Sequence, residues 1–178
     1  MSEFIINDGE LIQYNGLDSE VIIPDNVVKI KNQAFYRCKF LTKVVIPNSV
    51  IEIGEYAFAD GYQLEFAQFP EKLESIGKYA FANTRLQYIE LPESITKIEE
   101  GAFYGCIFLE SVSVFGKINK MSRLMFYKCY SLSKAIIPND ITKIEEYVFA
   151  DCYELENIKL PENLNFVAKY AFANTKLK

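Results

Sequence analysis

An internal repeat of about 23 residues constrains this sequence of 178 residues more than any other feature. Phenylalanine recurs with spacings of 23, 23, 22, 23, 23 and 23 residues, at Phe35, Phe58, Phe81, Phe103, Phe126, Phe149 and Phe172. Proline keeps the same period at Pro24, Pro47, Pro70, Pro92, Pro138 and Pro161, with Phe115 in the one vacant position. A period of this length is the signature of a solenoid, in which successive units stack on one another.

Each unit follows one pattern of apolar residues, L-x-x-[VI]-x-[IL]-P-x-x-[VIL]-x-x-I-x-x-x-A-F-x-x-[CGT], as in residues 41–61. The segment before the proline alternates, which predicts a strand with one buried face. Proline lacks an N–H donor and fixes φ, so it ends this strand and turns the chain before a second short strand. One unit cannot bury its own apolar residues, so we expect stacked ladders of Val, Ile, Phe and Ala, roughly 4.8 Å apart.

One link between units is shorter than the rest. Phe81 and Pro92 are 11 residues apart, one fewer than the usual interval, and the missing residue falls in the turn at 82–86. The short form recurs at 173–177. Residues 47–86 match residues 138–177 at 22 of 40 positions, which indicates that the array grew partly by copying a block of four units.

The two ends of the sequence differ from the repeat. Residues 1–17 do not fit the unit, and residues 4–14 read as a hairpin with an Asp-Gly turn signal, so we predict an N-terminal hairpin cap. Residues 18–178 then form a single domain of about seven units of 22–23 residues, the last one incomplete. The sequence stops where another strand is expected, which predicts either an open edge that self-associates or a longer array.

Composition argues against several classes of function. The formal charge is −5 and histidine is absent, which disfavours nucleic acid as a partner and removes the commonest proton-transfer side chain and metal ligand. Four cysteines occupy the position three residues after the Phe, which holds small residues in every unit; they are Cys38, Cys106, Cys129 and Cys152. We therefore interpret the cysteines as packing residues and not as a metal or redox site. We expect no cofactor, no metal and no catalytic residue.

The N-terminal segment also lacks the features of an export signal. An acidic residue, Glu3, stands where a secretory signal carries basic residues, and no apolar run approaches the length of a membrane span. As given, the sequence therefore predicts a cytoplasmic protein that does not insert into membranes.

The repeat pattern resembles the BspA-like, or treponemal-type, leucine-rich repeats over residues 18–178. This resemblance implies a right-handed solenoid with a parallel β-sheet on the concave face, and short strands and turns or single helical turns on the convex side. It also implies a binding role, often adhesion by cell-surface proteins, so the alternative location is the cell surface or the exterior. The family carries no common catalytic residues.

Candidate binding residues are those that vary where their neighbours are constant. On the predicted concave strands, aromatic Phe66 and Tyr88 occupy the same column in neighbouring units, with Val45, Gln68 and Glu90 beside them. An exposed aromatic cluster with a polar rim is typical of a protein-binding surface. The alternative is that the two rings only stabilise the sheet by cross-strand stacking.

Three functional hypotheses follow. The first is a non-catalytic module that binds a protein ligand through the concave sheet, with Phe66 and Tyr88 as anchors. The second is a structural or assembly role through pairing of the C-terminal edge. The third is carbohydrate binding, which only the abundance of aromatic and acidic residues favours.

Overall fold

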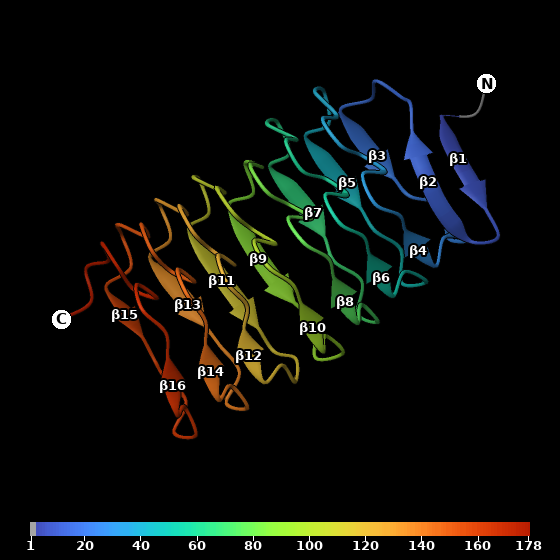
Figure 1. Cartoon of the computed structure of the whole chain (residues 1–178). Helices are drawn as coiled ribbons and strands as arrows, with labels where there is room; N and C mark the ends of the chain where they lie inside the picture. The colour runs from blue at the N-terminus through green and yellow to red at the C-terminus, as the bar shows by residue number, and fades with distance from the viewer. Residues whose placement is uncertain (1–2) are drawn as a thin grey trace.

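In the computed structural model, which describes residues 3–178, the segment before each proline position forms one short strand per coil (Figure 1). We call this array the pre-proline sheet. Pairing between neighbours is parallel and follows the repeat, with Lys43 opposite Phe66 and Val45 opposite Gln68. Its strands are β3 (Glu20–Ile22), β5 (Lys43–Val45), β7 (Phe66–Gln68), β9 (Tyr88–Leu91), β11 (Ser111–Val114), β13 (Lys134–Ile136) and β15 (Asn157–Ile158).

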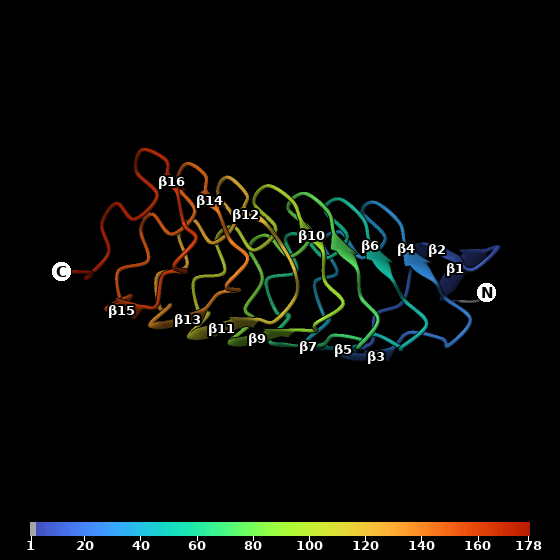
Figure 2. The same ribbon diagram turned by 90° about the horizontal axis from the view of Figure 1, so that it is seen from below.

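After the proline position each coil forms a second, two-residue strand, and these strands make the post-proline sheet. In Figure 1 they lie in a row beside the first, and Figure 2 shows the two rows separated by the interior of the solenoid. The strands are β4 (Lys29–Ile30), β6 (Glu52–Ile53), β8 (Ser75–Ile76), β10 (Lys97–Ile98), β12 (Lys120–Met121), β14 (Lys143–Ile144) and β16 (Phe166–Val167).

A hairpin covers the N-terminal end of the post-proline sheet, as the sequence predicted. Strand β1 (Phe4–Asn7) pairs antiparallel with β2 (Glu10–Tyr14), and β2 pairs in parallel with β4. The turn residues Asp8 and Gly9 both have positive φ, 47° and 76°, which is the geometry that the Asp-Gly signal favours. The first two residues of the predicted cap lie outside the described residues.

The Ala-Phe segment of each coil forms a tight turn, and none of residues 3–178 is helical. Residues two before and two after each Phe have positive φ, as at Tyr56 and Asp60 around Phe58. The N–H of Phe35 donates to the Ala57 carbonyl at 2.7 Å, and the equivalent bond recurs in later coils. The turns are therefore joined by a third hydrogen-bonded ladder.

The core is a stack of phenylalanine rings along the axis of the solenoid. Successive rings from Phe35 to Phe172 lie nearly parallel, with centroids 4.7–5.6 Å apart. Alanine usually precedes the Phe and is buried, and the substituted residues Met125 and Val148 are also fully buried. The predicted ladders of apolar residues are confirmed.

Both sheets are interrupted near the middle of the molecule. The pre-proline sheet divides into β3-β5-β7 and β9-β11-β13-β15, so β7 does not pair with β9. The post-proline sheet divides one coil later, between β10 and β12, where the Ser122 hydroxyl donates to the Ile98 carbonyl at 2.6 Å. The first interruption lies where the sequence placed its candidate binding residues.

Candidate binding groove between β7 and β9

The predicted binding residues lie on the outer face of the pre-proline sheet. Phe66 and Gln68 flank the inward-facing Ala67 on β7, and Tyr88 and Glu90 flank inward-facing Ile89 on β9. All four are exposed, whereas Val45 at the end of β5 is only partly exposed. This alternation follows from the strand itself, because successive side chains point to opposite faces.

The short link at 82–86 accounts for the separation of β7 from β9. Its Arg85 N–H donates to the Leu64 carbonyl at 2.9 Å, a bond that the other short link repeats from Lys176 to Leu155 at 3.0 Å. In the coil before, the first strand residue Phe66 donates to the Thr42 carbonyl at 3.1 Å. Because the chain reaches the strand one residue early, the corresponding bond from Tyr88 is not made.

A second hydrogen bond is missing at the other end of the strand pair. Ile23 and Ile46 each donate from their N–H to the next coil, to Val45 and Gln68 at 3.0 and 3.2 Å. Phe69, the equivalent residue after β7, has no such bond among the described residues. The facing edges of β7 and β9 therefore carry backbone N–H groups, those of Phe69 and Tyr88, without the partners that their equivalents Ile46 and Phe66 have between β5 and β7.

Phe69 fills part of the gap between the two strands. The same inward-facing position holds smaller, buried residues in other coils, such as Ile46 and Leu91. Phe69 is instead half-buried, and its ring meets the core ring of Phe81 edge-on at 5.3 Å and 69°. A larger side chain thus shields the core at the point where the sheet opens.

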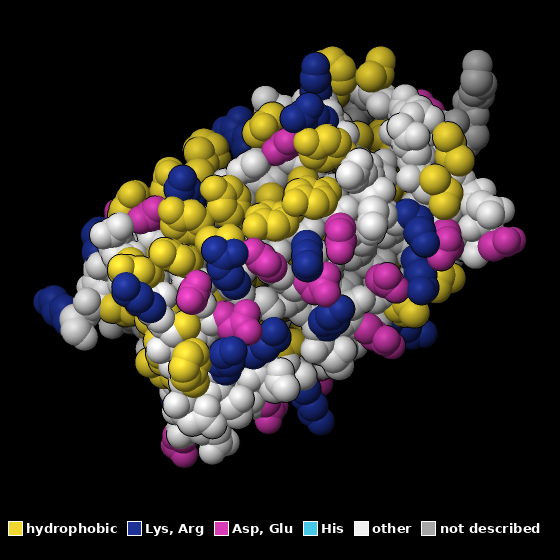
Figure 3. All heavy atoms as spheres, in the orientation of Figure 1, with side chains coloured by type: hydrophobic (Ala, Val, Ile, Leu, Met, Phe, Trp, Pro, Cys, Tyr) yellow, Lys and Arg dark blue, Asp and Glu magenta, His cyan; other side chains and the backbone are white. Residues whose placement is uncertain are grey.

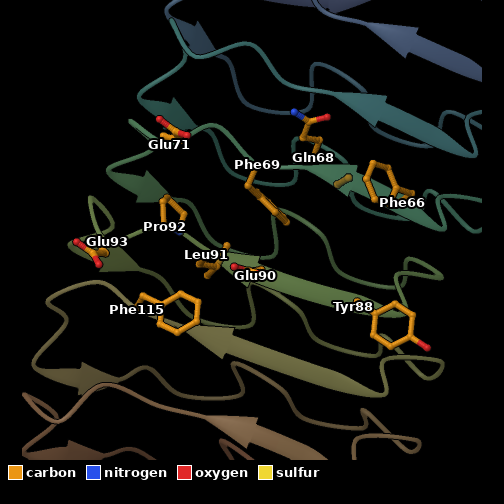
Figure 4. Close-up of a pocket in the computed structure, with 11 residues that line it drawn as sticks. Phe66, Gln68, Phe69, Glu71, Tyr88, Glu90, Leu91, Pro92, Glu93 and Phe115 are labelled. Atoms are coloured by element: carbon orange, nitrogen blue, oxygen red, sulfur yellow. The ribbon is translucent and has the colours of Figure 1, made fainter.

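The opening is a groove of about 840 Å³ on the surface of the pre-proline sheet (Figure 4). Phe66 and Tyr88 lie at one end of the groove, and Glu71 and Glu93 lie at the end near the prolines. Apolar side chains line most of the part between, and Figure 3 shows hydrophobic side chains gathered along this face. The apolar and uncharged lining residues are Phe66, Ala67, Gln68, Phe69, Tyr88, Leu91, Pro92 and Phe115.

The charge in the groove has one sign. Glu71, Glu90 and Glu93 line it, and no lysine or arginine does. None of these carboxylates forms an ion pair within residues 3–178. About half of the other acidic side chains in this range do have cationic partners, such as Glu52 with Lys29 at 3.0 Å.

The polar groups at the aromatic end of the groove have partners outside the groove. The Lys43 ammonium lies 6.0 Å from the centre of the Phe66 ring and pairs with Glu20 at 3.5 Å. The Tyr88 hydroxyl donates to Glu110 at 2.8 Å, and this hydrogen bond raises the pKa of Tyr88 above its usual value. Tyr88 therefore remains a neutral aromatic side chain at physiological pH.

The arrangement differs from the prediction in one respect. Phe66 and Tyr88 lie on neighbouring coils, but their strands belong to separate sheets and their rings do not pack together in the described chain. Cross-strand stacking therefore does not explain these two aromatic residues. Sequence reasoning also missed the groove-lining Phe69 and Phe115, although an aromatic residue in an aliphatic or proline position was a visible signal.

The cysteines and tyrosines outside the groove have structural roles. Cys106, Cys129 and Cys152 are fully buried, and each thiol lies within hydrogen-bond distance of a carbonyl of the phenylalanine stack. Burial raises the pKa of Cys129 and Cys152 well above the usual thiol value. Outside the core, tyrosines pack in a second aromatic row, as in the stacked pair Tyr56 and Tyr79 at 5.3 Å. Within the described chain, no three acidic or cysteine side chains are grouped as metal ligands.

Comparisons with known proteins agree with this architecture. Residues 15–106 and 74–178 match the BspA type leucine rich repeat region, in 6 copies. A leucine rich cell surface protein from Faecalibacterium prausnitzii has a TM-score of 0.82 and 27% identity, over 98% of this chain and 53% of that one. A leucine-rich repeat protein from Bacteroides ovatus has a TM-score of 0.71 and 26% identity, over 99% and 58%.

A shorter relative matches along most of its own length. The leucine rich repeat protein of T. pallidum has a TM-score of 0.65 and 26% identity, over 83% of each chain. The present chain spans little more than half of the first two relatives. No curated protein matches the sequence. Within residues 3–178 there is no helix of the length and apolarity that crossing a bilayer requires.

Proposed function

Since the chain belongs to the BspA-type leucine-rich repeat family, we propose that it is a non-catalytic module that binds a protein through its pre-proline sheet. Phe66 and Tyr88 are the proposed anchors, with Val45, Gln68 and Glu90 around them. One observation carries the proposal: two aromatic side chains, 49% and 60% exposed, stand at either side of an apolar groove. Large apolar groups exposed together on a folded domain typically mark an interaction site.

The family context supports a binding role outside the cell. The Faecalibacterium prausnitzii relative is described as a cell surface protein. We therefore propose a partner exposed at a cell surface, with the groove as the contact region.

A selection experiment tests the anchors. Binders are selected from a displayed library of small folded domains against the wild-type chain, and their affinities are then measured for the double variant F66A/Y88A. Each aromatic anchor contributes about 2 kcal/mol or more at a binding hot spot, so we expect affinity to fall by at least about thirtyfold for binders of this face.

The matched control uses exposed aliphatic residues of the same sheet away from the groove. Ile22 on β3 and Ile136 on β13 are 74% and 41% exposed, and I22A/I136A is expected to change affinity by less than about twofold. If binders recognise F66A/Y88A as well as the wild type, the two aromatic residues are not anchors and the proposal is wrong.

The two other hypotheses stay predictions. Sedimentation velocity at several concentrations tests self-association through the last coil, and a strictly monomeric chain would contradict it. A glycan array tests carbohydrate binding.

A further inference from the structure

We propose that the groove between β7 and β9 binds an extended, basic polypeptide segment, with an apolar side chain inserted between the strands and a lysine or arginine beside it. This inference rests on the proposed function and defines the chemistry of its partner. Three independent features of the groove select this occupant: the apolar lining, the free backbone edges and the unpaired carboxylates.

The apolar lining favours the insertion of an apolar side chain. Phe69, Leu91 and Phe115 line the middle of the groove, and its volume of about 840 Å³ falls within the range of sites that bury most of a ligand. Figure 4 shows Phe69 directed from the end of β7 toward β9, so an inserted apolar side chain would rest against its ring. Such a contact makes the binding free energy more favourable, because both apolar surfaces are removed from water.

The backbone edges select an extended polypeptide. The N–H groups of Phe69 and Tyr88 lack the carbonyl acceptors that their equivalents Ile46 and Phe66 have between β5 and β7. Strand edges with unpaired groups bind extended segments by adding a strand, in which the main chain supplies hydrogen bonds and alternate side chains supply specificity. A folded, convex surface would leave the edges of the groove unpaired, and a carbohydrate offers hydroxyl groups without the regular spacing of a peptide backbone.

The carboxylates select a cation. Glu71 and Glu93 lie at the proline end of the groove and Glu90 on β9, and none has an ion-pair partner in residues 3–178. An acidic partner would place like charges together, which disfavours association, whereas a basic side chain gains contacts and faster encounter. The bound segment therefore presents its apolar residue to the middle of the groove and its basic residue toward the prolines.

The test uses a short labelled peptide of alternating lysine and leucine, with fluorescence anisotropy at low ionic strength as the readout. Two comparison peptides carry glutamate in place of lysine, or N-methyl groups on the backbone amides, which crowd the strand edge and prevent the extended pairing that places peptide carbonyls opposite the Phe69 and Tyr88 N–H groups. We expect binding of the lysine-leucine peptide and loss of binding for both comparison peptides. Absence of binding by the lysine-leucine peptide would overturn the proposal.

Three protein variants separate the groove from general electrostatic attraction. E71Q/E90Q/E93Q removes the groove carboxylates and is expected to weaken binding about tenfold. D25N/D140N/E162Q removes the same charge from exposed positions just after other prolines and should leave affinity unchanged. Equal weakening by both variants would overturn the proposal. Insertion of a tyrosine between Thr84 and Arg85, combined with Phe69→Ile so that the ring no longer blocks the gap, is expected to close the groove and should abolish binding while Phe66 and Tyr88 remain.

The outcomes also separate this inference from the proposed function. Library binders that depend on Phe66 and Tyr88 but tolerate E71Q/E90Q/E93Q and the insertion would overturn the basic-segment proposal alone. Binders that tolerate F66A/Y88A would overturn the anchors, whatever the peptide does.

Discussion

The shortened link at 82–86 is the feature whose effect can be reversed most directly. Inserting one tyrosine between Thr84 and Arg85 reproduces the longer link Gly61-Tyr62-Gln63-Leu64 of the preceding coil. We expect β9 to move into register with β7, so that the N–H groups of Tyr88 and Phe69 gain carbonyl acceptors. Two backbone hydrogen bonds at about 0.5–1.5 kcal/mol each raise the free energy of unfolding by about 1–3 kcal/mol.

Two terms oppose this gain. One additional loop residue costs only a few tenths of a kcal/mol in closure entropy. Phe69 presents the larger obstacle, because its ring occupies the gap against Phe81. The insertion should therefore be combined with Phe69→Ile, which restores the aliphatic residue found at this position in β3 and β5 coils as Ile23 and Ile46.

Urea unfolding followed by circular dichroism and tyrosine fluorescence measures the change, since the chain has 12 tyrosines and no tryptophan. Amide hydrogen exchange at Tyr88 and Phe69 should slow by at least about tenfold, the equivalent of 1.4 kcal/mol. The matched control inserts a tyrosine between Gly61 and Tyr62, which lengthens a regular link and should destabilise the chain. If both insertions destabilise equally and exchange at Tyr88 is unchanged, link length does not separate the strands.

Three further predictions follow from the core and the surface. Phe103→Ala should lower the free energy of unfolding by about 3–5 kcal/mol, because the ring is fully buried between two others. Phe172→Ala should lower it clearly less, because the Phe172 ring is only partly buried. Equal losses in urea titrations of the two variants would contradict the stacking argument. Cys38 is the one partly exposed cysteine of the described chain, so in the native protein it alone should react with a thiol reagent. Burial raises the pKa of its thiol to about 11, so the reaction should become faster as pH rises toward 11. Rapid reaction of the three buried cysteines would be inconsistent with the structure. Burial alone would raise the pKa of Asp60, but hydrogen bonds from Asn83 and Arg37 hold this pKa below its usual value. Asp60→Asn should therefore lower the free energy of unfolding by about 1–2 kcal/mol at pH 7, and this loss should disappear as pH falls through the lowered pKa of Asp60. An equal loss at pH 2 and pH 7 would refute the charge-based explanation.

The sequence predicts the regular part of this fold well because the repeat itself encodes it. Each buried Phe, Ile and Ala occupies one position of the 23-residue unit, and stacking equivalent positions is the one arrangement that buries all of them. The hairpin followed similarly from a local signal, since Asp8 and Gly9 favour the required turn. In both cases local preference and tertiary packing point to the same structure.

The interruption of the sheet was harder to predict, although its signals were present. A missing residue can be absorbed in a turn or in a strand pair, and the 22-residue spacing does not distinguish the two. Here the turn ladder is maintained, with the Phe81 N–H donating to the Ala102 carbonyl at 2.8 Å, and β8 still pairs with β10. The missing residue therefore disrupts the pairing of β7 with β9. This outcome depends on competition among contacts of the whole coil, which a local sequence pattern does not predict.

The turn geometry was also beyond sequence reasoning. Tyrosine and leucine disfavour positive φ, yet Tyr56, Tyr147 and Leu124 adopt φ of 54–59°. The hydrogen bonds and ring packing of neighbouring coils stabilise these conformations. Glycine, asparagine and aspartate, as at Gly101, Asn83 and Asp60, show the preference for positive φ that a local reading expects.

These observations explain why the proposed binding site lies at an irregularity of a regular array. In regular coils the strands satisfy one another's backbone groups, and several charged side chains pair with the neighbouring coil, as Lys29 does with Glu52, so mainly side chains of the outer face remain for recognition. Between β7 and β9 the backbone pairing is interrupted, and the apolar residues and three carboxylates without ion pairs line the opening at the same place. The shortened link thus gives the proposed site hydrogen-bonding, apolar and charged groups together, a combination that a perfect repeat of the same composition would lack.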